Sequence, residues 1–409
     1  MARMQPTVDQ RDGSPGTAAS DTSQGGLARF IACALAEPSL QKELAAFNSS
    51  DELVARAAGA ARQRGISLDA GAIEVAMEAR ISGASAGGGD APPAGWLPVA
   101  TSWRNGALAL RWSYFGEARL RAPFFAMEVQ STVGKPFNRL VRPESAIERL
   151  LDRPHAPSLP RPSGLIFHMS RCGSTLVAQM LAACADNVVI SEAGPIDDVV
   201  RARQVRPDLA EEEQARWLAG IVGALGRPRA GERRLFVKLD CWHTLAFPLF
   251  RRAFPDVPWV FLYRDPVEVM VSQRRMPGVQ MIPGALGQPE LLGLAPSFDR
   301  PDEYCARVLA CVCEPIVQQH AQGGGLLVNY RDLPQALWTA ILPHFGVAAS
   351  AEERAAMAKK AKDDAKMPGL EFTPDSEARQ RDAKPATRAA AAEWLADIYG
   401  RLEALRLGA

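Results

Sequence analysis

The sequence predicts an α/β fold, in which a parallel sheet is flanked by helices, together with a small N-terminal all-helical domain. Short apolar runs recur in the C-terminal two thirds of the chain and are separated by helix-like segments, the pattern of a parallel sheet covered on both faces. Residues 27–81 contain only amphipathic helical patterns. With 409 residues, of which 47% are hydrophobic, the chain can bury a full core and form more than one domain.

Charge and cysteine content argue against several classes of function. The formal net charge of +1 gives no sign of a nucleic-acid or membrane partner. No apolar stretch is long enough to cross a bilayer and the N-terminus lacks the order of a signal peptide, so we expect a cytoplasmic location. The 7 cysteines are scattered without a CxxC pair, which indicates neither a disulfide framework nor a zinc site.

Composition divides the chain into successive segments. Ser50 has the features of a helix start and Gly65 those of a helix stop, and a turn at Asn105 and Gly106 within alternating residues predicts a hairpin. The predicted segments are 1–24, disordered; 25–81, a small helical domain; 82–95, a flexible linker; 96–160, an extension with the hairpin; and 161–409, the main α/β domain.

Five apolar runs are the predicted strands of the main domain. Each ends at a polar or charged residue, and the carboxyl ends of parallel strands meet at one edge of a sheet, which is where α/β sheets bind ligands. The runs are 165–167, 188–191, 234–239, 259–263 and 326–330.

The stretch LIFHMSRCGSTL, residues 165–176, predicts a strand, a tight loop and the start of a helix. Unpaired N–H groups at such a helix start, with two hydroxyls and an arginine beside them, suit a phosphate in a P-loop-type arrangement. A buried strand that turns into a helix through small residues is the alternative. The anion-binding candidates are Arg171, Cys172, Gly173, Ser174 and Thr175.

A second candidate anion site lies in WVFLYRDPVEVMVSQRR, residues 259–275. Arg264 follows the predicted strand directly, and Ser272 lies two turns along the next helix. A guanidinium fork and a hydroxyl at this spacing suit a phosphate. The alternative is a solvated Arg-Asp pair after an edge strand.

The two motifs together resemble the sulfotransferases that use 3′-phosphoadenosine 5′-phosphosulfate (PAPS), and the sequence is similar to their bacterial branch. SRCGST resembles the first signature of that family and RDPVEVMVS the second, and the resemblance covers about 165–400. It implies that Arg171, Gly173, Ser174 and Thr175 hold the 5′-phosphosulfate, and that Arg264 and Ser272 hold the 3′-phosphate. Cys172 stands where the family usually has Ser or Gly.

The resemblance implies in-line transfer of a sulfonate to an acceptor hydroxyl or amine. No metal is required in principle, and the chain lacks the GxxxxGK[ST] motif of nucleoside triphosphate enzymes. Arg171 is placed to stabilise charge on the leaving group, with help from Lys238. Glu192 is the first candidate for the catalytic base, and Asp240 and His243 are the reserves.

The N-terminal helical segment resembles the nif-eleven-like leader-peptide domain. The residues that carry this resemblance are Phe30, Pro38-Ser39-Leu40, Ser50-Asp51-Glu52-Leu53, Ala57-Ala58 and Gly65-Ile66-Ser67. It implies a module that recognises a peptide or protein partner in natural-product biosynthesis. A small helical appendage is the alternative.

Two other classes of function stay open. A P-loop kinase or nucleotide hydrolase would use the same sheet edge with Asp240 or Asp265 on Mg²⁺, and a non-catalytic nucleotide-binding protein would keep only the pocket. The acceptor is a small molecule or a peptide. The apolar segment 278–300 favours an acceptor with an apolar body.

Overall fold

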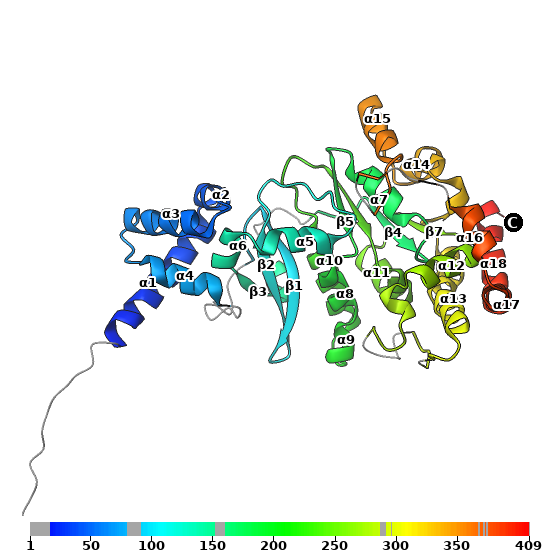
Figure 1. Ribbon diagram of the computed structural model, residues 1–409, viewed down its shortest axis with the longest axis horizontal. Helices are drawn as coiled ribbons and strands as arrows, with labels where there is room; N and C mark the ends of the chain where they lie inside the picture. The colour runs from blue at the N-terminus through cyan, green and yellow to red at the C-terminus, as the bar shows by residue number, and fades with distance from the viewer. Residues whose placement is uncertain are drawn as a thin grey trace, which may run out of the picture. The chain divides into compact units, whose positions relative to one another are not determined.

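A computed structural model (Figure 1) describes residues 17–79, 91–151, 160–286, 292–295, 297–366, 369–370, 373 and 375–408. The chain forms two compact units. The first combines the residues before 87 with 133–143, and the second combines 87–132 with 144–409. The sequence assigned 133–143 to the extension, whereas the structure groups this segment with the N-terminal helices.

The first unit is all-helical. Its apolar core includes Phe30, Leu44 and Leu53, which are fully buried. Helix α3 begins at Ser50, and Gly65 follows its end with a φ of +67°, as the sequence indicates. The helices are α1 (Thr17–Ala36), α2 (Pro38–Ala45), α3 (Ser50–Gln63), α4 (Ala70–Glu78) and α6 (Pro136–Leu140).

One expectation for this region differs from the structure. The structure has helix α1 from Thr17, whereas the sequence predicts disorder up to residue 24. The rest of that expected segment, 1–16, lies outside the described residues, as do 80–90, which include most of the expected linker.

The second unit starts with a hairpin that belongs to a small antiparallel sheet. Strands β1 (Trp96–Arg104) and β2 (Ala107–Tyr114) pair across a turn at Asn105 and Gly106, where the sequence places it. Both turn residues have positive φ, which matches the twist of the strands. Strand β3 (Glu144–Ala146) pairs with β2 on the other side.

The main sheet has five parallel strands in the order β5-β6-β4-β7-β8, which confirms the predicted fold class. Since β4 lies in the centre, the loop that follows it sits in the middle of the carboxyl edge. The strands are β4 (Gly164–His168), β5 (Asn187–Ser191), β6 (Arg234–Lys238), β7 (Trp259–Tyr263) and β8 (Gly325–Asn329).

Helices cover both faces of this sheet. In Figure 1, α7, α14 and α15 lie on one side of the sheet and α10, α11 and α13 on the other. The helices of this unit are α5 (Phe125–Val133), α7 (Ser174–Ala182), α8 (Gly194–Val200), α9 (Ala202–Val205), α10 (Glu211–Leu225), α11 (Phe247–Ala253), α12 (Pro266–Arg275), α13 (Pro301–Gln319), α14 (Leu342–His344), α15 (Ala351–Lys360), α16 (Ser376–Asp382), α17 (Pro385–Trp394) and α18 (Ala396–Leu407). None of the described helices has the length and apolar content needed to cross a membrane.

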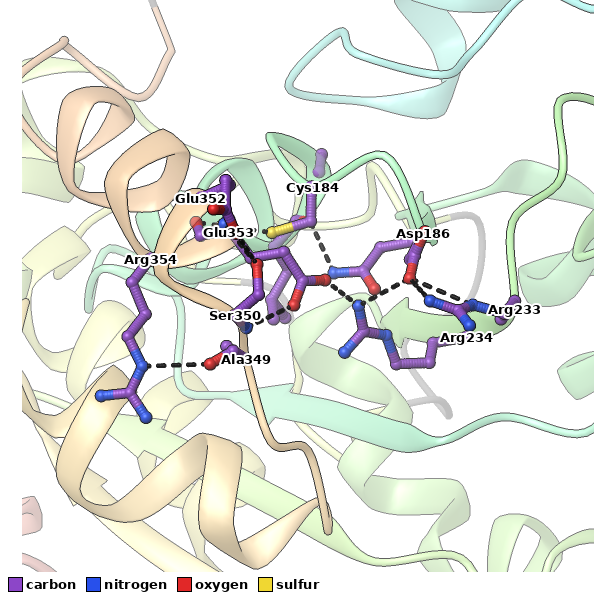
Figure 2. A network of polar contacts seen from close by, with 12 residues as sticks. Cys184, Asp186, Arg233, Arg234, Ala349, Ser350, Glu352, Glu353 and Arg354 are labelled. Atoms are coloured by element: carbon purple, nitrogen blue, oxygen red, sulfur yellow. Dashed lines mark hydrogen bonds and ion pairs between the residues drawn. The ribbon is translucent and has the colours of Figure 1, made fainter.

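A network of charges lies at the amino edge of the sheet, where β5 and β6 begin (Figure 2). Asp186 pairs with Arg233 and Arg234, and Arg234 also pairs with Glu353 of α15. The network borders a cavity of about 370 Å³. Since its charges neutralise one another and it lies opposite the carboxyl edge, we interpret it as the anchor of α15 rather than a ligand site.

The close packing around Trp259 predicts that one methyl group added at Gly325 lowers the stability of the fold. A Cβ added to Gly325 in β8 would lie 2.6 Å from Cε2 of the fully buried Trp259 ring. We expect Gly325→Ala to lower the free energy of unfolding by about 1 to 3 kcal/mol, because the core cannot absorb the added volume. Chemical denaturation measures this change.

Gly400→Ala in α18 is the matched control. Nothing lies within 4 Å of a Cβ at Gly400. Alanine favours a helix over glycine by up to about 1 kcal/mol, so the control should be neutral or more stable than the parent. Equal stabilities of the two variants would contradict the packing described here.

Candidate active site

The loop between β4 and α7 is shaped by left-handed backbone. Ser170, Arg171 and Gly173 have φ values of +79°, +53° and +86°. A Cβ on Gly173 would lie 2.7 Å from Leu333 Cδ1 and 2.8 Å from Tyr330 Cδ2, so only glycine fits there. Backbone of this kind, followed directly by a helix start, directs N–H groups toward an anion.

Buried polar side chains fix the loop through hydrogen bonds to Ser170. The Ser170 hydroxyl accepts hydrogen bonds from Gln273 (2.9 Å) and Gln280 (3.2 Å). The Ser170 N–H donates to Nδ1 of His168 at 3.0 Å. All four residues are buried, so the conformation of the loop is fixed before any ligand arrives.

The side chains of the loop divide into two groups. Cys172 is buried and its thiol donates to the Leu262 carbonyl at 3.0 Å, so this side chain belongs to the core and only its backbone N–H is left for a ligand. Burial raises the pKa of Cys172 to about 11. Ser174 and Thr175 are buried at the start of α7, and neither hydroxyl has a hydrogen-bond partner in the part of the chain that is described.

Arg171 leaves the loop toward the segment after α12. Its Nη2 donates to the Met276 carbonyl at 2.5 Å, and the side chain is partly buried. Burial lowers the pKa of Arg171, and the nearby carboxylate of Glu192 partly offsets this effect. Arg171 and Glu192, two of the predicted catalytic residues, are therefore within electrostatic reach of each other.

Lys238 and Glu192 form an ion pair at the ends of β6 and β5. The Lys238 side chain is 1% exposed and that of Glu192 is 24% exposed. Burial raises the pKa of Glu192, but the charge of Lys238 and the hydrogen bond from His168 outweigh it and hold the pKa well below its usual range. Glu192 is therefore an ionised carboxylate that fixes Lys238.

His168 is a site residue that the sequence analysis missed. Its Nδ1 accepts a hydrogen bond, so Nε2 carries the proton, which it donates to the Leu239 carbonyl at 2.9 Å. Glu192 Oε1 lies 3.4 Å from the same nitrogen. Burial and then the charge of Lys238 lower the pKa of His168, so the ring is neutral. Its place at the end of the strand before the loop was the available signal.

Asp240 and His243 follow β6, and His243 is held by Asp197. The Asp240 N–H donates to Nδ1 of His243 at 3.3 Å, so Nε2 carries the proton and donates to Asp197 at 3.0 Å. Asp197 also accepts from Trp242 at 2.7 Å and pairs with Arg201 at 2.9 Å. Burial raises the pKa of Asp197, but the hydrogen bonds from His243 and Trp242 outweigh it and lower the pKa to about 2.

Asp197, Asp240 and His243 are close enough together to be considered as metal ligands. Ligand atoms of Asp197, Asp240 and His243 lie within 4.8 Å of one another. The imidazole nitrogen closest to both carboxylates carries a proton that it donates to Asp197, and a metal ligand would need that nitrogen without its proton. We therefore interpret the cluster as a hydrogen-bonded support for Asp240.

Asp240 differs from the other carboxylates of the site. Its side chain is largely buried, and it lies 3.8 Å from His243. Burial, reinforced by the negative charges of Glu192 and Asp197, raises the pKa of Asp240 to about 7. A carboxyl group with this pKa exchanges a proton readily near neutral pH.

Arg264 is buried at the end of β7 and already has partners. Its Nε donates to Glu268 at 2.5 Å, and Nη2 donates at 2.9 Å to both Asp375 and Ser376. Its guanidinium lies 3.8 Å from the centre of the Tyr330 ring. Ser272 is buried on α12, and its hydroxyl has no hydrogen-bond partner among the described residues.

Tyr330 connects the two motifs in space. The edge of its ring packs against Gly173, with Cδ2 2.8 Å from the position that a Cβ would take. The Arg264 guanidinium stacks on the face of the same ring. The structure thus brings both predicted anion sites to one place. From the sequence, Tyr330 was expected only at the end of the last predicted strand and had no role in the site.

Lys366 adds a third positive charge near the first loop. Although the residue keeps contact with solvent, desolvation of its amine and repulsion from Arg171 and Lys238 together lower the pKa of Lys366 to about 8. Three cations thus gather near the carboxylate of Glu192.

Comparison with known proteins gives matches to solved structures alone. No protein-family model and no curated protein matches the chain significantly. The sulfotransferase domain of the curacin biosynthetic pathway is 18% identical over 58% of this chain and 98% of its own, with a TM-score of 0.40. That of the Synechococcus PCC 7002 olefin synthase is 17% identical over 62% and 97%, with a TM-score of 0.37. A sulfotransferase from Alicyclobacillus acidocaldarius is 14% identical over 61% and 96%, also with a TM-score of 0.37.

Proposed function

We propose that this protein is a sulfotransferase that moves a sulfonate from PAPS to an acceptor hydroxyl or amine. The observation that carries the proposal is the meeting of two anion-binding motifs at the carboxyl edge, where the Tyr330 ring contacts both Gly173 and Arg264. A nucleotide with phosphate groups on both its 5′ and 3′ positions needs two such sites a short distance apart. The sequence resemblance of both motifs supports the same donor.

The loop is suited to the 5′-phosphosulfate. Its fixed left-handed backbone and the start of α7 supply N–H groups, and Ser174 and Thr175 supply hydroxyls without other partners in the described structure. Arg171, Lys238 and Lys366 supply positive charge where negative charge develops on the leaving phosphate. Arg264 and Ser272 are assigned to the 3′-phosphate.

The transfer itself needs one proton acceptor. The acceptor oxygen attacks sulfur, the bond between sulfur and the bridging phosphate oxygen breaks, and adenosine 3′,5′-bisphosphate leaves with that electron pair. We assign the acceptor's proton to Asp240, because a pKa of about 7 suits a general base at neutral pH. Glu192, the first choice from the sequence, is a weaker base while Lys238 pairs with it, and we assign it the positioning of Lys238.

We assign the acceptor to the segment that follows α12, which carries exposed apolar side chains. Met276, whose carbonyl accepts from Arg171, is an exposed apolar residue, and Val279, Ile282 and Phe298 in the following segment are also exposed. An acceptor with an apolar body, either a small molecule or a peptide, fits this surface. A peptide or protein partner for the N-terminal helices and a cytoplasmic location stay predictions from the sequence.

Removing Arg264 tests the donor assignment. We expect adenosine 3′,5′-bisphosphate to bind the parent protein without added metal, and Arg264→Ala to weaken this binding by about ten- to a hundredfold, because a charge-assisted contact is lost. Isothermal titration calorimetry measures both affinities. Arg252→Ala is the control, since Arg252 lies at the end of α11 and pairs with Glu211 and Glu212 at the surface.

The opposite results would favour other functions. Binding of ATP only with Mg²⁺, without binding of the bisphosphate, would point to a kinase or hydrolase. Binding of the bisphosphate without any sulfonate transfer to a broad acceptor panel would point to a non-catalytic nucleotide-binding protein.

The raised pKa of Asp240 predicts a pH-dependent stability change. Between the ordinary value of 3.8 and about 7, the folded state keeps a proton that the unfolded state has released. The free energy of unfolding therefore falls as pH rises through this window, and the whole loss is present above pH 7. The side chain of Asp240→Asn cannot ionise, so this variant should not lose stability in this window. The difference in melting temperature between Asp240→Asn and the parent should therefore grow in favour of the variant as pH rises from 4 to about 7, and should stay constant from there to pH 8.

The same variant should lose activity. Without a general base, the rate of sulfonate transfer should fall by about a hundredfold or more. Asp256→Asn, at an exposed position, is the control and should change neither property. A variant at Asp240 that loses stability at pH 8 would contradict the assignment, because it would show that the ionised carboxylate stabilises the fold.

A further inference from the structure

A carboxylate of the chain itself lies at the candidate 3′-phosphate position. Asp375 directly precedes α16, and its two oxygens face two guanidinium groups. Oδ1 accepts a 2.9 Å hydrogen bond from Arg264, and Oδ2 lies 2.5 Å from Nη2 of Arg379. Asp375 therefore bridges two arginines in the way that a phosphate does.

Arg379 is poorly satisfied by this single partner. Its side chain is 14% exposed, and its Nε and Nη1 are buried without a hydrogen-bond partner in the described part of the chain. Burial lowers the pKa of Arg379, and the neighbouring charge of Arg264 lowers it further. Two positive groups thus share the Asp375 carboxylate, and Arg379 keeps two buried donors without a partner among the described residues.

A phosphate group suits this arrangement better than Asp375 does. A carboxylate offers two oxygens and one charge, whereas a phosphate monoester offers three terminal oxygens and up to two charges. The Asp375 side chain is 32% exposed, so it has a path to solvent. Arg264 keeps its place when Asp375 leaves, because Glu268 and the Tyr330 ring still hold it.

Helix α16 has other contacts with α12 and the residue before it. The Asp375 side chain can therefore move away from Arg264 while α16 stays in place. Gln380 donates to Asp265 at 3.0 Å, and Asp382 pairs with Arg275. The exchange therefore needs only a rotation of the Asp375 side chain.

We propose that Asp375 is an internal competitor for the 3′-phosphate, and that Arg379 is the second arginine that binds this phosphate once Asp375 has moved away. The inference rests on the proposed function, since it takes the ligand to be a nucleotide with a 3′-phosphate. The chain thereby lowers its own affinity for the nucleotide, and product release is assisted when Asp375 returns to the two arginines.

Calorimetric titration of two variants tests both parts. Asp375→Asn removes the competing charge, so adenosine 3′,5′-bisphosphate should bind about fivefold more tightly or better. Arg379→Gln should weaken the same binding by about tenfold or more. Adenosine 5′-monophosphate lacks the 3′-phosphate, and its affinity should be the same in the parent and in both variants.

Two variants on the same helix serve as controls. Glu377→Gln and Arg381→Gln remove one negative and one positive charge at exposed positions of α16 and should leave both affinities unchanged. Weaker or equal binding of the bisphosphate by a folded Asp375→Asn would overturn the competitor role. An Arg379→Gln variant with parental affinity would overturn the role of Arg379, and thermal melting establishes that each variant is folded.

A failure of the proposed function gives a different result. If the parent binds neither nucleotide, inorganic phosphate is the probe for the two arginines alone. If phosphate binds Asp375→Asn more tightly than it binds the parent, Asp375 competes with an anion at this site, but the anion is not part of this nucleotide. No gain with phosphate would overturn the competitor as well.

Discussion

The left-handed turn between β4 and α7 is the constraint on which the rest of the site depends. Gly173 has no room for a side chain, because Tyr330 and Leu333 lie against it, and Ser170 is fixed from below by Gln273 and Gln280. This turn aims the start of α7 at the carboxyl edge of the central strand. The same Tyr330 ring supports Arg264, so the position of the second motif depends on the first.

The site concentrates charge within a chain that is close to neutral overall. Its buried cations are each paired with a carboxylate of the same chain, as Lys238 is with Glu192 and Arg264 is with Glu268 and Asp375. Pairing lowers the cost of burying these groups before a ligand arrives. An anionic ligand must therefore compete with internal carboxylates, and a near-neutral composition does not argue against a polyanionic substrate.

Much of the fold and part of the site could be predicted from local sequence. The five apolar runs gave the strands of the parallel sheet to within one or two residues, and the turn at Asn105 and Gly106 placed the hairpin. These features depend on short-range pattern and turn chemistry. The inclusion of 133–143 in the N-terminal unit, and the roles of His168, Asp375 and Arg379, depend on contacts between residues far apart in the chain. The low pKa of Glu192 and the raised pKa of Asp240 also arise only from such contacts.

A crystal structure of the protein with adenosine 3′,5′-bisphosphate tests the central claim most directly. We expect the 5′-phosphate to lie against the backbone of Gly173, Ser174 and Thr175, and the 3′-phosphate to lie within hydrogen-bond distance of Arg264. The account is contradicted if the nucleotide binds away from the carboxyl edge of the sheet, or if its 3′-phosphate points into solvent while Arg264 still contacts Asp375.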